Sequence, residues 1–272
     1  MRRFLTFILL PLIFGITAFN AKVEAKAENP NTIVLYSHHP EDTPSYQWLN
    51  RVYQDLFSRI DFNVEVKFMP SGRATLEAEK GLIEGQFGRI YSYQSLYPSQ
   101  RRVNVPIYKM TIEAYALKDK SISLTNGWQS FEDTNHLVEY KRGVVVSQQN
   151  LVKYVTKENL STVTSTYQGF SKLTHHRSDI FIFSKAGSFP YLQSAEFKNQ
   201  IKSVGTMAQN NLYLYVHEKY AFIIPALESA IKDMQANDII YRHCLAAYQQ
   251  SGKEICTLLK PSNSLHNEKM SL

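Results

Sequence analysis

Arg89 is the residue whose chemistry the surrounding sequence defines best. It follows a short predicted strand in the segment that begins at Gly81 and reads GLIEGQFGRI. A guanidinium presents a planar fork of N–H donors that matches a carboxylate, so an arginine at a strand end is suited to hold an anion. A structural ion pair with Glu84 or Glu113 is the alternative, and the sequence leaves both uses open.

Polar and aromatic residues end the first predicted strand, which spans residues 31–37. Tyr36, Ser37 and His38 would provide an aromatic wall and hydrogen-bonding groups for a small polar solute. Tyr91, two residues after the arginine, is a further candidate for lining the same site. Because the chain holds 17 tyrosines, packing in the core is the alternative role of each one.

Two further candidate regions lie in the second half of the chain. We predict that Ser147 caps a helix whose first turn includes Gln148, and free backbone N–H groups at a helix start favour an anion. Asp179 opens the apolar strand of residues 180–183 and could pair with an amine of the solute. Ordinary helix capping and an ordinary strand-edge aspartate are the respective alternatives.

Two pairs of adjacent histidines, His38/His39 and His175/His176, raise the question of a metal site. Neighbouring side chains in a strand or a helix point in different directions, so one pair rarely supplies two ligands, and we expect no metal and no cofactor. The sequence has no nucleophile-elbow, zinc-protease or phosphate-loop motif, so we expect no enzymatic activity. A secreted hydrolase stays open, because catalytic triads assemble from distant positions.

The first half of the chain alternates strands and helices. A strand over residues 31–37 precedes a helix capped by Thr43, and residues 63–68 alternate as a second strand. A second helix is predicted from a capping Ser71 through Lys80, followed by Gly81, where a residue tolerant of positive φ is favoured. This alternation predicts a parallel sheet flanked by helices, with ligands at the carboxyl ends of the strands.

A second series of elements follows the polar stretch of residues 118–126. It comprises predicted strands at 144–146, 162–166, 180–183 and 211–217, and a long helix at 220–236. This order predicts two α/β lobes joined by two crossings of the chain. The first lobe takes residues 28–116 and 203–272, and the second takes residues 117–202.

The first 27 residues are typical of a signal peptide. Arg2 and Arg3 precede an apolar run over residues 4–19, and Ala25 and Ala27 form an AxA cleavage site. The apolar run is shorter than the roughly 20 residues that span a bilayer, although a retained anchor is the alternative. No cysteine follows the run, so we expect no lipid anchor and a periplasmic location.

Charge and cysteines narrow the functional classes further. Beyond residue 27 the chain holds 26 basic and 23 acidic residues, a mild net charge of +3, and no basic cluster that would indicate nucleic acid. The two cysteines, Cys244 and Cys256, are predicted to form a disulfide in an oxidising compartment. Two free thiols are the alternative.

Two segments resemble bacterial periplasmic solute-binding proteins of the amino-acid-binding type, known as family 3. The segment GLIEGQFGRI followed by LYPSQRRVNVPI is similar to the family block GxxDGxxxR … YPxxxxVPxPI. The segment NLYLYVHEKYAFIIPALESAIKDMQAND is similar to the tail of the same family. The likeness covers residues 32–258, and Glu84 stands where the family block has aspartate.

The resemblance implies a type 2 periplasmic binding protein fold, in which each lobe is a mixed sheet flanked by helices and the ligand cleft lies between the lobes. It implies capture of a small polar solute, an amino acid or related organic anion, by lobe closure for an inner-membrane ABC permease. A sensor protein that feeds a signalling partner is the alternative, and a module that binds only other proteins is another. We expect a monomer.

Overall fold

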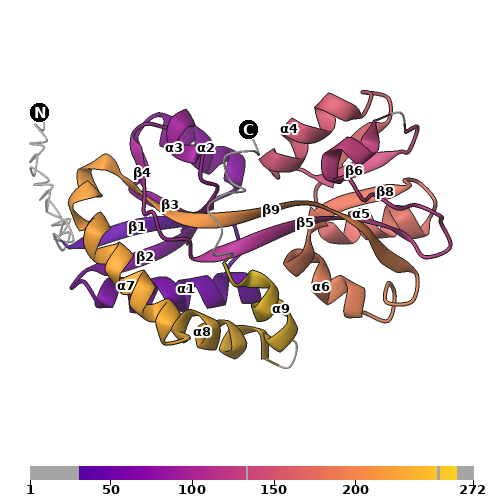
Figure 1. The fold of residues 1–272 in the computed structure, drawn as a ribbon. Helices are drawn as coiled ribbons and strands as arrows, with labels where there is room; N and C mark the ends of the chain where they lie inside the picture. The colour runs from indigo at the N-terminus through magenta and orange to yellow at the C-terminus, as the bar shows by residue number, and fades with distance from the viewer. Residues whose placement is uncertain (1–30, 133, 250–251, 262–272) are drawn as a thin grey trace, which may run out of the picture. The chain divides into compact units, whose positions relative to one another are not determined.

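The computed structural model describes residues 31–132, 134–249 and 252–261, whose strands form one mixed sheet with helices on both faces (Figure 1). The predicted signal peptide lies outside the described residues. Within those residues, no helix is both long enough and apolar enough to cross a membrane.

The strands follow the order β2-β1-β3-β9-β5-β8-β6-β7 across the sheet, and β4 pairs separately with β9. They are β1 (Thr32–Ser37), β2 (Asn63–Phe68), β3 (Gly85–Arg89), β4 (Gln100–Arg102), β5 (Tyr108–Leu117), β6 (Val138–Lys141), β7 (Leu160–Val163), β8 (Ile180–Ser184) and β9 (Ile201–His217). The helices are α1 (Pro44–Ser58), α2 (Ser71–Glu79), α3 (Tyr93–Leu96), α4 (Val145–Tyr154), α5 (Thr166–Thr174), α6 (Lys185–Gln193), α7 (Ile224–Ala236), α8 (Ile239–Tyr248) and α9 (Gly252–Leu259), with 3-10 turns η1 (Gly127–Phe131) and η2 (Glu218–Ile223).

The first half of the sheet follows the predicted alternation. β1 pairs in parallel with β2 on one side and β3 on the other, so the carboxyl ends of these strands lie at one edge. α1 begins as predicted, because the Thr43 side chain accepts from the Tyr46 N–H and Pro44 occupies the first turn. Ser71 is wrongly predicted as a cap, since it is already helical after Pro70.

The second half contains one wrong strand. The β-branched run 144–146 is not extended, and the strand lies earlier, at β6, while Val145 begins α4. Gly143 has a φ of +87°, which turns the chain before the valines. β6 is buried between β7 and β8, whereas Val145 is 49% exposed, so tertiary pairing outweighs local β propensity here.

β9 and β5 connect the two halves of the sheet. The last residues of β9 pair with β3 and β4, and its earlier residues pair with β5. The predicted strand 211–217 is confirmed, but β9 begins ten residues earlier, at Ile201. The predicted helix 220–236 is a 3-10 turn, η2, followed by α7.

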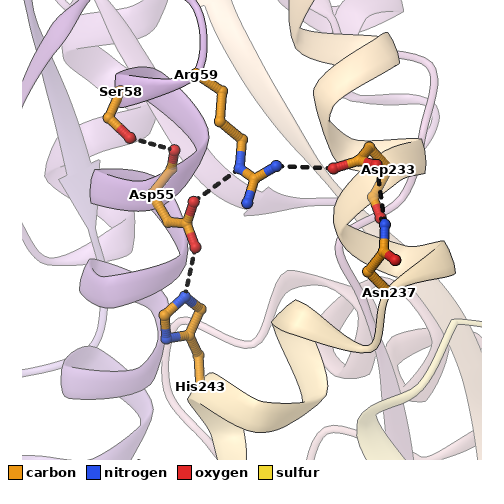
Figure 2. Close-up of polar contacts among 6 residues, drawn as sticks. All are labelled: Asp55, Ser58, Arg59, Asp233, Asn237 and His243. Atoms are coloured by element: carbon orange, nitrogen blue, oxygen red, sulfur yellow. Dashed lines mark hydrogen bonds and ion pairs between the residues drawn. The ribbon is translucent and has the colours of Figure 1, made fainter.

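α1, α7, α8 and α9 cover one face of the first half of the sheet (Figure 1). On the outer side of α1, Asp55 accepts from Arg59 (Nε–Oδ1 2.7 Å) and from His243 of α8 (Nε2–Oδ2 2.8 Å), and Arg59 also pairs with Asp233 of α7 (2.7 Å), as Figure 2 shows. Burial alone would raise the pKa of Asp55, but the hydrogen bonds from His243 and Arg59 hold it below its usual value. Two carboxylates, Asp55 and Asp233, thus link three helices through Arg59 and His243.

The predicted disulfide is confirmed. Cys244 of α8 and Cys256 of α9 are bonded, with their Cα atoms 5.8 Å apart, and both are buried. The bond joins two helices that pack against the same apolar core as α1.

Replacing both cysteines with alanine should lower the free energy of unfolding by about 3 kcal/mol, because the crosslink closes a short loop and restricts the unfolded chain. Urea unfolding measures this loss. The unmodified protein treated with a reductant serves as the control and should approach the stability of the variant. Equal stability of the oxidised protein and the variant would contradict the prediction.

Candidate functional site

Arg89 is positioned by a bulge at the end of β3. Phe87 pairs with Leu214 of β9, and the next residue to pair is Arg89, with Tyr213, so Gly88 is left out of the ladder. Gly88 has a φ of +74°, which glycine adopts without strain. The skipped residue turns Arg89 to the same face of the sheet as Gln86, whose side-chain oxygen accepts from the Arg89 Nε (2.7 Å).

The Arg89 guanidinium is surrounded by neutral groups. Gln86 is fully buried and donates to the Tyr93 hydroxyl (2.6 Å), and the guanidinium carbon lies 5.3 Å from the centre of the Tyr93 ring. Burial lowers the pKa of Arg89, although Tyr93 and Tyr108 oppose this effect.

Neither carboxylate considered from the sequence pairs with Arg89. Glu84 accepts from Lys219 (2.7 Å), Tyr220 (2.7 Å) and the Val34 N–H (2.7 Å), so it fastens β1 to the segment after β9. Glu113 pairs with Lys185 (3.1 Å). Within the described residues, Arg89 therefore has no acidic partner.

The turn after β1 brings two histidines to the same edge. The Ser37 hydroxyl accepts from the His39 N–H (3.1 Å), which closes the turn, and the rings of His38 and His39 lie 4.1 Å apart. Because β1 and β3 are parallel neighbours, this turn lies beside the end of β3. A Cβ atom at Gly88 would be 3.1 Å from the His38 ring.

Tyr108, the first residue of β5, completes this side of the site. A Cβ atom at Gly88 would lie only 2.4 Å from the Tyr108 hydroxyl, so only glycine fits there without a shift. The Tyr108 hydroxyl and the His38 Nδ1 are both buried without a hydrogen-bond partner in the described part of the chain. Buried polar groups are normally paired, so these two atoms are free to serve a ligand.

Lys141, the last residue of β6, contributes a charge from the second half of the sheet. Its side-chain nitrogen lies 4.7 Å from the centre of the Phe183 ring, and burial lowers its pKa. It lies close enough to the histidines to lower the pKa of both. The arrangement therefore combines groups from β1, β3, β5 and β6.

The histidines are neutral near pH 7. Burial, and then the charge of Lys141, lower the pKa of His39 to about 4. Burial, followed by His39, Arg89 and Lys141, lowers the pKa of His38 well below its usual value. The fixed charges of the site are thus the two cations, Arg89 and Lys141, and this electrostatic arrangement favours an anion.

The other residues predicted for the site lie in varied surroundings. Tyr36 is half-buried against the cluster that contains Tyr93. Tyr91 is covered by Arg102, whose guanidinium lies 3.5 Å from the centre of its ring. In the described part of the chain, no hydrogen bond or cation–π contact joins either residue to Arg89, and their roles as ligand contacts stay predictions.

The site residues predicted in the second lobe lie in two places, at the start of α4 and before β8. Ser147 is the third residue of α4, not its cap, and its hydroxyl is buried without a partner in the described structure, while Gln148 is exposed. Asp179 lies before β8, at the opposite end of that strand from Ser184, and accepts from the Leu137 N–H (2.9 Å). The structure does not place Asp179 beside Arg89 or Lys141.

Sequence analysis missed His39, Lys141, Tyr108 and Gly88 as parts of the site. Lys141 was missed because the strand was predicted at residues 144–146. With β6 placed correctly, Lys141 is the last residue of the strand, at its carboxyl end. Tyr108 has no local signal that separates it from the other 16 tyrosines. Gly88, one residue before the candidate arginine, was a detectable signal for a bulge.

Comparison with known proteins found a sequence relative and solved structures of similar fold. No model of a known protein family matches the chain. An uncharacterized protein of Shewanella oneidensis is 25% identical over 222 residues, which cover 81% of this chain and 83% of that protein.

Solved structures resemble this chain in fold, although their sequence identity to it is low. An ancestral arginine-binding protein bound to glutamine matches with a TM-score of 0.62 at 12% identity, covering 81% of this chain and 99% of that one. A histidine kinase sensor domain with similarity to periplasmic binding proteins has a TM-score of 0.63 at 11% identity, with 80% and 96% covered. The chain has the two-lobed periplasmic binding protein fold.

A third structure with the periplasmic binding protein fold comes from Streptococcus pneumoniae. It is an amino acid ABC transporter substrate-binding protein bound to L-arginine, with a TM-score of 0.61 at 9% identity, covering 82% of this chain and 96% of that one. The fold expected from the sequence is confirmed, with β5 and β9 as the strands common to both halves of the sheet.

Replacing Gly88 with alanine should destabilise the protein more than replacing Gly143 with alanine. Both glycines have positive φ, but nothing lies within 4 Å of an added Cβ at Gly143, whereas Gly88 meets Tyr108 and His38. We expect a backbone cost of about 1–2 kcal/mol at each site and a further loss of about 1–3 kcal/mol at Gly88. Equal losses in urea unfolding would contradict the packing around Gly88.

The free energy of unfolding should fall as the pH is lowered from about 6.5 to about 4. A histidine with a lowered folded pKa binds its proton first in the unfolded chain, so stability is lost across this window, by up to about 1.4 kcal/mol per pH unit for each histidine. Urea unfolding at a series of pH values measures the slope. A variant with His38→Gln and His39→Gln should show a shallower slope, and an unchanged slope would contradict the assignment.

Proposed function

We propose that this protein binds a small polar solute, an amino acid or related organic anion, by closing its two lobes around it. The observation that carries the proposal is the Arg89 guanidinium, which lies at the end of β3 with neutral neighbours and no acidic partner in the described residues. Buried charges in proteins are normally paired, so a solute carboxylate is the partner that this charge lacks.

Closure is the proposed mechanism. We propose that the first lobe takes residues 28–116 and 203–272 and the second takes residues 117–202, which gives Arg89 to the first and Lys141 to the second. A solute that contacts both lobes stabilises the closed form over the open one by its differential affinity. A partner protein then needs to recognise only the closed form.

The proposed location follows from the predicted signal peptide, and the proposed partner follows from the comparisons. The signal peptide predicted in residues 1–27 would send the protein to the periplasm without a lipid anchor, where a disulfide such as Cys244–Cys256 persists. We propose delivery of the solute to an inner-membrane ABC permease by a monomer without enzymatic activity. The substrate-binding proteins among the matching folds support this role.

A sensory role is the second candidate. The match to a histidine kinase sensor domain, with a TM-score of 0.63, supports it, because the same closure can deliver a signal in place of a solute. In that case the closed form would bind a signalling protein, and solute recognition by Arg89 would be unchanged.

The Arg89→Ala variant should lose at least tenfold in affinity, about 1.4 kcal/mol, because a charged hydrogen bond to the solute is removed. A thermal-shift screen with L-glutamate, L-arginine, succinate, citrate and spermidine identifies a binding compound, since a ligand of the native state raises its melting temperature. Calorimetric titration then compares the variant with the unmodified protein.

Arg101→Ala provides the matched control. The Arg101 side chain is 41% exposed and pairs with Glu218 (3.1 Å), so its loss removes the same charge away from the site and should change the affinity less than twofold. Equal affinity of the Arg89 variant and this control would exclude Arg89 as the anchor. A flat screen with a folded protein would contradict solute binding and favour a protein-interaction role.

A further inference from the structure

Resting on the proposed function, we propose that Gln86 is the positioning residue of Arg89. Its side-chain amide holds the guanidinium in one orientation and leaves the positive charge uncompensated, so that a solute carboxylate can pair with it. The proposal rests on two hydrogen bonds, on the burial of the amide and on the strand that carries it. It assigns a role to a residue whose effect on the solute is transmitted through Arg89.

The Gln86 amide is bonded at both of its ends. Its oxygen accepts from the Arg89 Nε (2.7 Å), and its nitrogen donates to the Tyr93 hydroxyl (2.6 Å). Gln86 is fully buried, and Tyr93 is buried as well. Exchanging the amide oxygen and nitrogen would place a donor against the Arg89 donor, so the amide has one favourable orientation. These two bonds therefore fix the direction in which the guanidinium is held.

Gln86 and Tyr93 are themselves held by the sheet and by packed rings. Gln86 pairs with Tyr36 of β1 on one side and with Tyr215 of β9 on the other. The Tyr93 ring packs edge-on against Tyr215, with ring centres 5.2 Å apart, and its centre lies 4.4 Å from that of Tyr97. Side chains that are carried by paired strands and surrounded by packed neighbours hold their geometry most precisely.

The amide orients the guanidinium without neutralising it. A glutamate in place of Gln86 would form charge-assisted hydrogen bonds with Arg89 and would compensate its charge inside the protein. The two acidic residues considered as partners of Arg89 are instead bound to lysines, Glu84 to Lys219 and Glu113 to Lys185. The preference of the site for an anion therefore depends on an uncharged side chain at position 86.

A purely structural role for Gln86 is the alternative, and the Gln86→Glu variant separates the two roles. If Gln86 only satisfies polar groups in the core, substitution should lower the stability and the solute affinity together. If Gln86 positions an uncompensated charge, the variant should be more stable without solute, because the buried Arg89 gains a carboxylate partner. The same change should weaken solute binding, because the solute carboxylate then competes with an internal one.

Urea unfolding without solute measures the effect on stability. The Gln86→Glu variant should have a higher urea midpoint than the unmodified protein. The same substitution in an Arg89→Ala background should lower the midpoint, because the new carboxylate then lacks its cation. Gln100→Glu is the matched control. Gln100 is fully buried in the same half of the sheet and donates to the Ile83 carbonyl oxygen (3.1 Å), so a carboxylate there should lower the midpoint.

Calorimetric titration with L-glutamate, succinate and citrate measures the effect on binding. We expect Gln86→Glu to weaken binding of the tightest of these three anions at least tenfold. Gln86→Met keeps a similar volume but loses both hydrogen bonds, and it should weaken binding about threefold or more. Gln100→Met, which removes a buried amide away from Arg89, should leave the affinity within twofold.

The outcomes separate this inference from the proposed function. A higher urea midpoint together with weaker anion binding, in Gln86→Glu and not in Gln100→Glu, would support the positioning role. A lower midpoint for Gln86→Glu, or an affinity within twofold of that of the unmodified protein, would overturn it and leave solute binding intact. Binding of none of the three anions to the unmodified protein would contradict both proposals.

Discussion

The positive charge of Arg89, held among neutral side chains, is the constraint on which the proposed site depends. A guanidinium in such surroundings is costly unless a partner compensates it, and the described residues around it include Gln86, Tyr93 and Tyr108 but no acidic partner. The nearby histidines are kept neutral and add no compensation. The protein therefore has an unsatisfied preference for an anion at one edge of its sheet.

Strand pairing and helix packing elsewhere in the fold hold Arg89 in these surroundings. β9 pairs with β3 on one part of its length and with β5 on another, so the bulge at Gly88 and the start of β5 at Tyr108 are fixed by the same strand. Among the helices that pack on this half of the sheet, the ion pairs of Asp55, Arg59, Asp233 and His243 and the disulfide hold α1, α7, α8 and α9 together. Stability there offsets the cost of an unpaired charge at the site.

Local signals predicted the elements that local interactions determine. Thr43 and Pro44 define the start of α1, Gly81 ends the turn after α2 with a φ of +69°, and the alternation of residues 63–68 gives β2. The failure at residues 144–146 has a clear cause, because three valines favour a strand in isolation but Gly143 turns the chain before them. That single misplacement hid Lys141 from the predicted site.

The alternation of strands and helices, the candidate arginine and the cysteine pair could be predicted from the amino-acid sequence. These depend on periodicity, residue type and spacing, which can be read along the chain. The ion pairs of Glu84 and Glu113 with lysines, the place of Asp179 at the far end of its strand from Ser184 and the influence of Lys141 on His38 follow from the folded chain alone. The physical reason is that electrostatic partners are chosen by distance in space, and strand order brings together residues that are far apart in sequence.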